Sequence, residues 1–318
     1  MLTGHAALER ARNALSKVIG QHGLPFAHNA HERDAWLEML CLPIAQAIFA
    51  DVRACKLVGV SGAQGTGKST LAALLQALLV EGFGARTLLI SLDDYYLTQA
   101  ARKELAQLVH PLLVTRGVPG THEIESLLST LQAARRATAG ELVELMHFDK
   151  AADERAAHTT RHEGPFDVVL LEGWCVGARP QTQDELRAPI NALEANEDRD
   201  GAFRGYVNAE LTGRYGAVWN ELDMLVFLAA PDIPAVHAFR RQQEHALQRR
   251  AAQAAADGKA TAATRTGIMT DSQLERFIAH FERITAHMLS GTPNYADIVV
   301  QLDAQRHVEA VEIYHSTT

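Results

Sequence analysis

Residues 61–70 read SGAQGTGKST. Within this stretch, Gly62, Gly67, Lys68 and Ser69 match the phosphate-binding loop pattern G-x-x-x-x-G-K-[ST]. A short apolar run (KLVGV) precedes the loop, and the residues after it place leucines at helical spacing. Strand, glycine-rich loop and helix is the order that this pattern needs, so the stretch predicts a site for a nucleoside triphosphate.

The chemistry of this loop follows from its backbone. Glycines let successive N–H groups turn toward an anion, and the start of the following helix adds the positive end of its dipole. Lys68 can reach the β- and γ-phosphates, and the Ser69 hydroxyl can ligate Mg²⁺. We therefore expect the phosphates to be bound by Gly62, Ala63, Gln64, Gly65, Thr66, Gly67, Lys68, Ser69 and Thr70.

Composition limits the class of protein. The chain has 318 residues, 47% of them hydrophobic, which suffices for one large α/β domain or two smaller ones. Its 30 basic and 38 acidic residues give a net charge of −8, which argues against a general nucleic-acid or membrane surface. Cys41, Cys55 and Cys175 form neither a disulfide framework nor a zinc pattern. With no signal core and no membrane-spanning run, we expect a cytoplasmic protein.

Five buried apolar runs separated by helices predict the fold class. This pattern is typical of an α/β fold with a five-stranded parallel sheet flanked by helices, and the loop on the first strand makes it a P-loop NTPase fold. The tail beyond Val308 carries no assignment, and the charged residues 181–205 are expected to form an external insertion or a mobile loop. The predicted strands are 56–60, 86–91, 167–171, 222–228 and 297–302.

Helices before and after the sheet complete the predicted organisation. Residues 1–50 are expected to form an N-terminal helical extension packed on a main domain of residues 51–318. Residues 233–250 predict a helix and 251–266 a flexible segment, so that a lid and mobile segment would cover about 233–266. A later helix, 270–289, begins with the capping-box pair of Thr270 and Gln273.

Acidic side chains follow two of the predicted strands. Asp93 and Asp94 come directly after the second run, and Glu172 follows the third. Open α/β sheets bind ligands at the carboxyl ends of their strands, so these carboxylates favour a site over a turn or helix cap. The position of Glu172 is typical of a carboxylate that binds Mg²⁺ directly or supports its ligands. From the residues alone, Thr121 predicts the cap of the next helix, and His122 a residue at that helix start.

Six stretches in this order carry a family resemblance. The chain resembles D-glycerate 3-kinase and related bacterial kinases of the phosphoribulokinase, uridine kinase and pantothenate kinase group, from about residue 56 to about residue 302. The phosphate loop alone is shared by many NTPases, and the ordered set is more specific. The stretches are GAQGTGKST at 62–70, SLDDYYLT at 91–98, RGVPGTHE at 116–123, FDKA at 148–151, LLEGWCVG at 170–177 and FRRQQE at 239–244.

The resemblance implies ATP and Mg²⁺ as cofactors and a small-molecule hydroxyl acceptor, with D-glycerate the favoured one. It implies Lys68, Asp93 and Arg240 as catalytic residues, with Asp93 as the base and Arg240 as the phosphate contact of the lid. Ser69 and Glu172 would bind the metal. The acceptor pocket would be lined by Asp93, Tyr96, Arg116, His122 and Lys150.

Two other readings stay open at this point. One is a nucleoside or pantothenate-type kinase on the same scaffold. The other is a P-loop ATPase that acts as a conformational switch, which would favour a guanine-reading Asn-Lys-x-Asp box; the nearest stretch, Asn220–Asp223, lacks the lysine. A glycerate carboxylate would need a cation, and the planar fork of Arg116 is the candidate. The oligomeric state is left open.

Overall fold

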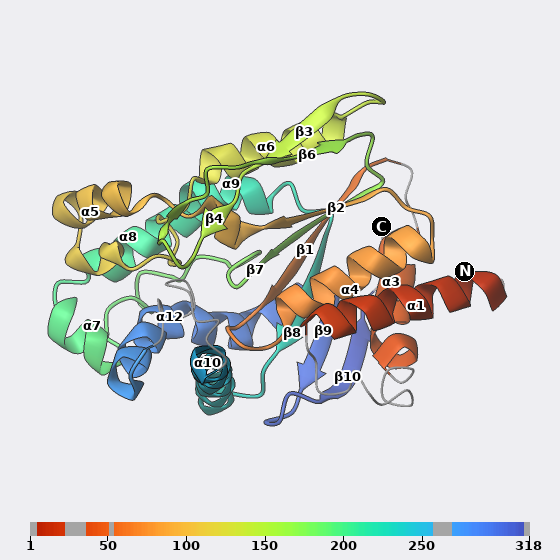
Figure 1. Cartoon of the computed structure of the whole chain (residues 1–318). Helices are drawn as coiled ribbons and strands as arrows, with labels where there is room; N and C mark the ends of the chain where they lie inside the picture. Colours follow the sequence, from red (N-terminus) through yellow and green to blue (C-terminus); the bar gives the residue numbers. More distant parts are fainter. Residues whose placement is uncertain (1–4, 23–35, 51–53, 257–268, 315–318) are drawn as a thin grey trace.

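A computed structural model of the chain describes residues 5–22, 36–50, 54–256 and 269–314. Its centre is a six-stranded sheet with the order β10-β9-β8-β1-β7-β2 (Figure 1). Neighbouring strands among β9, β8, β1, β7 and β2 pair in parallel, and β10 pairs antiparallel with β9. The bounds are β1 (Lys56–Gly62), β2 (Thr87–Ser91), β7 (Val168–Gly173), β8 (Met224–Ala229), β9 (Ile298–Leu302) and β10 (Val308–Ile313).

The predicted α/β P-loop fold is confirmed, but the predicted count of five strands is wrong. The sixth strand, β10, is the antiparallel edge strand that the unassigned tail forms. Its residues are half-buried or exposed, with two glutamates, Glu309 and Glu312, among its valines. An edge strand of this kind has no continuous apolar run, which is why the sequence pattern did not reveal it.

Two hydrophobic clusters cover the two faces of the sheet. Successive side chains of a strand point to opposite faces, so Leu57 of β1 packs in one cluster and Val58 in the other. On the Val58 face lie α1 (His5–His22), a π-helical turn (Leu37–Cys41), α3 (Leu42–Phe49) and α4 (Lys68–Glu81). On the other face lie α6 (Ile124–Arg136), α8 (Ala202–Glu210), a π-helical turn (Leu211–Tyr215), α9 (Gly216–Trp219) and α12 (Asp271–Gly291).

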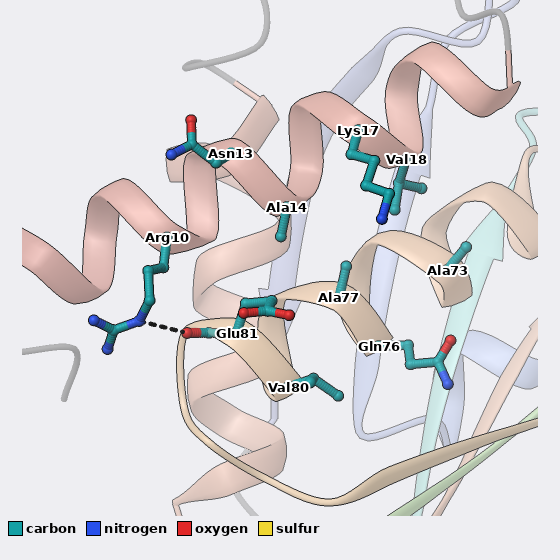
Figure 2. A pocket seen from close by; sticks show the side chains of 10 residues that line it. All are labelled: Arg10, Asn13, Ala14, Lys17, Val18, Ala73, Gln76, Ala77, Val80 and Glu81. Atoms are coloured by element: carbon teal, nitrogen blue, oxygen red, sulfur yellow. Dashed lines mark hydrogen bonds between the residues drawn. The ribbon is translucent and has the colours of Figure 1, made fainter.

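The N-terminal helix α1 lies alongside α4 (Figures 1 and 2). Leu15 and Ile19 of α1 are buried in the same cluster as the leucines of α4. Beside them the two helices leave a groove of about 560 Å³, lined by small apolar residues and polar side chains, including Arg10 and Lys17 (Figure 2). None of the predicted site residues lines this groove. The division of the chain near residue 50 stays a proposal.

Two small antiparallel sheets stand apart from the main sheet. β3 (Leu142–Leu145) pairs with β6 (Thr160–Glu163), and β4 (Phe148–Asp149) pairs with β5 (Glu154–Arg155). The second pair is a hairpin that carries the FDKA stretch. Between β2 and α6 the chain forms a 3-10 turn (Leu92–Tyr95), α5 (Gln99–Leu108) and a further 3-10 turn (Pro111–Val114).

The charged segment 181–205 is only partly external. From Asn191 onward it forms α7 (Ala192–Glu197) and the start of α8. Two buried ion pairs fix it: Arg204 Nη1 lies 2.8 Å from Asp198, and Arg283 of α12 lies 2.7 Å from Glu194. The prediction of an external insertion or mobile loop is therefore wrong for this half, because charges that indicated solvent form ion pairs inside the protein, one within the segment and one with α12.

The predicted lid forms one long helix, α10 (Ile233–Ala256). Residues 251–256, expected to be flexible, continue it, and 257–266 lie outside the described residues. The capping box of Thr270 and Gln273 is confirmed at the start of α12, which a 3-10 turn (Thr292–Asn294) follows. Among the helices described, none has the length and apolar content that crossing a membrane requires.

Candidate active site

The phosphate loop joins β1 to α4 at the carboxyl edge of the sheet. Gly65 and Gly67 have φ of 82° and 96°, left-handed conformations that glycine adopts without strain. Thr66 closes the loop, since its hydroxyl and its backbone N–H both donate to the carbonyl of Ala63, at 2.8 and 3.3 Å. α4 begins directly after Gly67, at Lys68. The loop therefore has the geometry that an anion-binding turn at a helix start needs.

The remaining loop residues occupy distinct environments. Gly62 is the last residue of β1, and Thr70 lies in the first turn of α4. Ala63 is buried in a small apolar cluster with Phe239 of α10. Gln64 lines a small cavity beside Arg240.

Gly65 lies directly against the lid helix. A Cβ at this position would come within 2.9 Å of the Cβ of Phe239 and 3.0 Å of its carbonyl carbon. The contact is reinforced from the β9–β10 turn, where Arg306 donates to the Gly65 carbonyl at 3.2 Å and to Gln242 of α10 at 3.0 Å. Loop, lid helix and terminal hairpin thus meet at one point.

Arg240, the predicted lid arginine, follows Phe239 on α10. Its Nη1 donates to the carboxylate of Glu244 at 3.1 Å, and its guanidinium lies 5.5 Å from the ring centre of Phe277. Glu244 is 1% exposed and also accepts from the backbone N–H of Met269 at 2.8 Å. A buried carboxylate therefore holds the arginine beside the phosphate loop. Its contact with phosphate stays a prediction.

Glu172 connects β7 to α4 and β2 at the same edge. It is the second-last residue of β7, which lies between β1 and β2, and its two oxygens accept from the hydroxyls of Ser69 at 3.0 Å and Ser91 at 2.6 Å. Carboxylate and hydroxyl oxygens are the donors that Mg²⁺ prefers, so Ser69 and Glu172 fit the metal expected from the sequence. Ser91 was not predicted, because a serine at the end of a buried strand gives no local signal of this contact.

Asp93 lies on the 3-10 turn after β2 and accepts two short hydrogen bonds. Its Oδ2 accepts from Lys150 Nζ at 2.6 Å, and its Oδ1 accepts from the Tyr96 hydroxyl at 2.7 Å. Burial alone would raise the pKa of Asp93, but the charges of Lys150 and Lys68 and these hydrogen bonds lower it to about 2. The side chain is therefore an ionised hydrogen-bond acceptor and a weak base at neutral pH.

Arg116 lies at the wall of this site with part of its guanidinium already bound. Its Nη1 pairs with Asp153, and its Nη2 donates to the backbone carbonyl of Lys150 at 3.2 Å. The guanidinium carbon is 5.8 and 5.6 Å from the ring centres of Tyr96 and Phe148. The sequence predicted an arginine open to an acceptor carboxylate, and the pairing with Asp153 was missed.

Thr121 and His122 form a buried turn before α6. Thr121 does not cap α6, so that prediction is wrong: its hydroxyl accepts from the N–H of Gly117 at 2.8 Å and donates to Val118 at 2.7 Å, which closes the turn. The His122 ring lies 4.9 Å from the Tyr96 ring, and the side chain is 1% exposed.

His122 is hydrogen-bonded to Tyr215. His122 Nδ1 lies 2.5 Å from the Tyr215 hydroxyl, which also accepts from the N–H of Gly120 at 3.0 Å. A hydroxyl oxygen can accept two hydrogen bonds, so either tautomer of the neutral imidazole makes this contact. Among the described residues, Nε2 has no hydrogen-bond partner.

The buried imidazole of His122 gives a pH dependence of stability. Burial, opposed in part by the charge of Asp93, lowers the pKa of His122 from 6.5 to about 4. Between these two pKa values the unfolded chain binds a proton that the folded protein does not. The free energy of unfolding therefore falls as the pH is lowered through this range. Between pH 7 and pH 5 we expect His122 to account for a loss of about 2 kcal/mol.

Urea unfolding of the wild type and of His122→Asn at the two pH values measures this effect. His280, whose pKa burial also lowers, is present in both proteins, so the difference isolates His122. The same pH dependence in both proteins would contradict the assignment.

Sequence comparison identifies the family. No model of a known protein family matches the chain. Over 206 residues, covering 61% of this chain and 72% of the relative, it is 34% identical to the uncharacterized kinase mug58 of Schizosaccharomyces pombe. The chain belongs to the same kinase family. The chloroplastic D-glycerate 3-kinase of Arabidopsis thaliana is 29% identical over 234 residues, 71% of this chain but only 46% of the plant enzyme.

Further comparisons agree with the predicted group. A pantothenate kinase of Lactococcus lactis is 28% identical over 128 residues. Among solved structures, D-glycerate 3-kinase from Cryptococcus neoformans var. grubii has a TM-score of 0.64 at 24% identity, covering 98% of this chain and 100% of that one. The structural likeness shows the fold, and the sequence relatives confirm the predicted P-loop kinase group. The chain is therefore assigned to the kinases.

Proposed function

We propose that this kinase transfers the γ-phosphate of ATP to a hydroxyl of D-glycerate. The observation that carries the proposal is the ionised carboxylate of Asp93 beside the phosphate loop, with Lys150 at 2.6 Å and Arg116 nearby. A carboxylate that accepts a hydroxyl hydrogen, next to cations that attract a second carboxylate, suits a small anionic hydroxy acid. The names of the Arabidopsis and Cryptococcus relatives support the same acceptor.

On the nucleotide side, the loop amides and Lys68 bind the β- and γ-phosphates. Ser69 and Glu172 would hold Mg²⁺, which would supply positive charge beside the phosphates. Arg240 contacts the transferring group from the lid helix. Since phosphoryl transfer passes through a loose transition state, most of the rate enhancement comes from positioning and from these cations.

On the acceptor side, Asp93 orients the attacking hydroxyl by accepting its hydrogen. Its low pKa makes full proton removal early in the reaction unfavourable, which agrees with a transition state in which the acceptor oxygen forms little bond. Tyr96 fixes the carboxylate, and the buried His122 ring packs against the Tyr96 ring at 4.9 Å. Lys150 and Arg116 attract the acceptor carboxylate.

Arg116→Lys should raise the KM for the acceptor selectively. A lysine keeps the charge but cannot donate two parallel hydrogen bonds, so we expect an increase of roughly 10-fold with little change in the KM for ATP. Steady-state kinetics with each substrate varied in turn measures both constants. A matching rise in the KM for ATP would argue against an acceptor-side position.

ADP release with MgATP and a panel of acceptors tests the proposed function. The panel holds D-glycerate, L-glycerate, uridine and pantothenate. Strong stimulation by D-glycerate alone is the expected result. Stimulation by uridine or pantothenate would replace glycerate with a nucleoside or pantothenate-type acceptor, and hydrolysis independent of any acceptor would favour the conformational ATPase.

A further inference from the structure

Asp153, outside the predicted site residues, contacts two arginines. It lies in the turn of the β4–β5 hairpin, and its Oδ1 is 2.7 Å from Arg102 Nη2 and also pairs with Arg116 Nη1. Arg102 of α5 is 3% exposed, and its other N–H groups donate to the carbonyls of Leu97 at 3.1 Å and Val114 at 2.8 Å. Asp153 is therefore anchored to a guanidinium that is itself fixed inside the protein.

The same hairpin carries Lys150, which meets the candidate catalytic carboxylate. Its backbone carbonyl accepts from Arg116 Nη2 at 3.2 Å, while its Nζ donates to Asp93 at 2.6 Å. Asp153 has a φ of 55°, a left-handed conformation that is uncommon outside glycine and is held here by tertiary contacts. The position of Asp153 thus determines where the hairpin tip, and with it Lys150, lies.

Arg116 retains donors for a ligand after these contacts. A guanidinium has five N–H groups, and the hairpin uses one on Nη1 and one on Nη2. Nε–H and one N–H on each terminal nitrogen are left. Asp153 could in principle compete with an acceptor carboxylate for Arg116, but its departure would leave Arg102 buried without its counter-charge. The geometry therefore favours Asp153 as a support for Arg116.

We propose that Asp153 is a positioning residue of the acceptor site, which holds Arg116 directly and Lys150 through the hairpin tip. This inference rests on the proposed function, because it assigns both cations to the acceptor. Asp153 itself touches no substrate. Its effect is on the binding of the acceptor and is separate from the phosphate loop and the nucleotide.

The kinetic test compares Asp153→Asn with Glu154→Gln, the neighbouring carboxylate of the same hairpin. Among the described residues, the Glu154 carboxylate accepts only from the N–H of Arg155, so Glu154 serves as the matched control. Loss of the charge that pairs with Arg102 and Arg116 in Asp153→Asn should raise the acceptor KM by roughly 10-fold or more, with kcat and the KM for ATP changed less than about 3-fold. Asp153→Glu, which restores the charge, should recover part of the loss.

The sign of the change separates the interpretations. A lower acceptor KM in Asp153→Asn would mean that Asp153 competes with the acceptor, and an unchanged KM would make it a structural ion pair; either result overturns the proposal. Turnover with none of the acceptors would contradict the proposed function instead.

Amide hydrogen exchange over residues 146–156 gives a readout that needs no acceptor. We expect faster exchange in Asp153→Asn than in the wild type or Glu154→Gln, because the hairpin tip loses its anchor. Equal exchange in all three proteins would overturn the proposal whatever the acceptor is.

Discussion

Asp93→Asn is expected to lower kcat by ~10²–10⁴-fold, the range for positioned acid–base groups, with the affinity for nucleotide little changed. An amide cannot match the charge of the carboxylate toward the acceptor hydroxyl, and it removes the counter-charge of Lys150 2.6 Å away. The phosphate loop does not depend on this side chain. Steady-state kinetics and nucleotide titration of the same protein measure the two quantities.

The neighbouring Asp94 provides the matched control. Its carboxylate accepts from the backbone N–H of Phe148 at 3.1 Å and lies 3.5 Å from the His147 ring, so it supports the hairpin instead of facing the acceptor. Asp94→Asn retains an oxygen for the first contact and should change kcat by less than about 10-fold. An unchanged kcat in Asp93→Asn would remove Asp93 from the mechanism.

Lys68→Ala is expected to lower kcat by ~10²–10³-fold, as the loss of one preorganised donor at a developing charge does, and also to weaken nucleotide binding. Lys68 starts α4 next to the loop amides, and its charge also helps to keep Asp93 ionised, so both halves of the site lose a cation. Single-turnover kinetics with titration of a fluorescent ATP analogue separates rate from affinity.

Lys103→Ala is the control for Lys68→Ala. Lys103 lies on α5, and within the part of the chain that the structure describes its ammonium donates only to Gln99, at 2.9 Å, so its loss should change neither rate nor affinity. Full turnover in Lys68→Ala would mean that the phosphate loop is not the active site.

The strands that the sequence pattern predicts correctly are those whose side chains are buried on both faces of the sheet. The runs that became β1, β2, β7, β8 and β9 are apolar because helices cover the sheet on both sides. The sequence pattern did not predict β10, because its glutamates face solvent at the sheet edge. For Asp198 and Glu194 the sequence pattern predicted exposure to solvent, and the structure buries both carboxylates. Their partners, Arg204 and Arg283, are brought to them by the tertiary fold.

The candidate site divides in the same way. Lys68, Ser69, Asp93 and Glu172 are candidates that the sequence indicates, because each follows a recognisable strand. The partners that fix the site, Tyr215 for His122 and Asp153 for Arg116, stand 93 and 37 positions away along the chain. No local periodicity or spacing links residues so far apart, and the resemblance quoted no motif that contains either partner. Their contribution becomes visible only when the fold brings them together.

Gly65 is more restricted in this structure than the phosphate-loop pattern requires. In G-x-x-x-x-G-K-[ST] it occupies a position that any residue can fill. In this chain its φ is 82°, and a side chain there would collide with the backbone of Phe239. A residue with a side chain therefore cannot replace Gly65 as long as α10 keeps its position. A homologue with a bulkier residue there would need a lid helix that lies farther from the phosphate loop. The residue type at this one position therefore indicates how closely the lid helix can approach the loop.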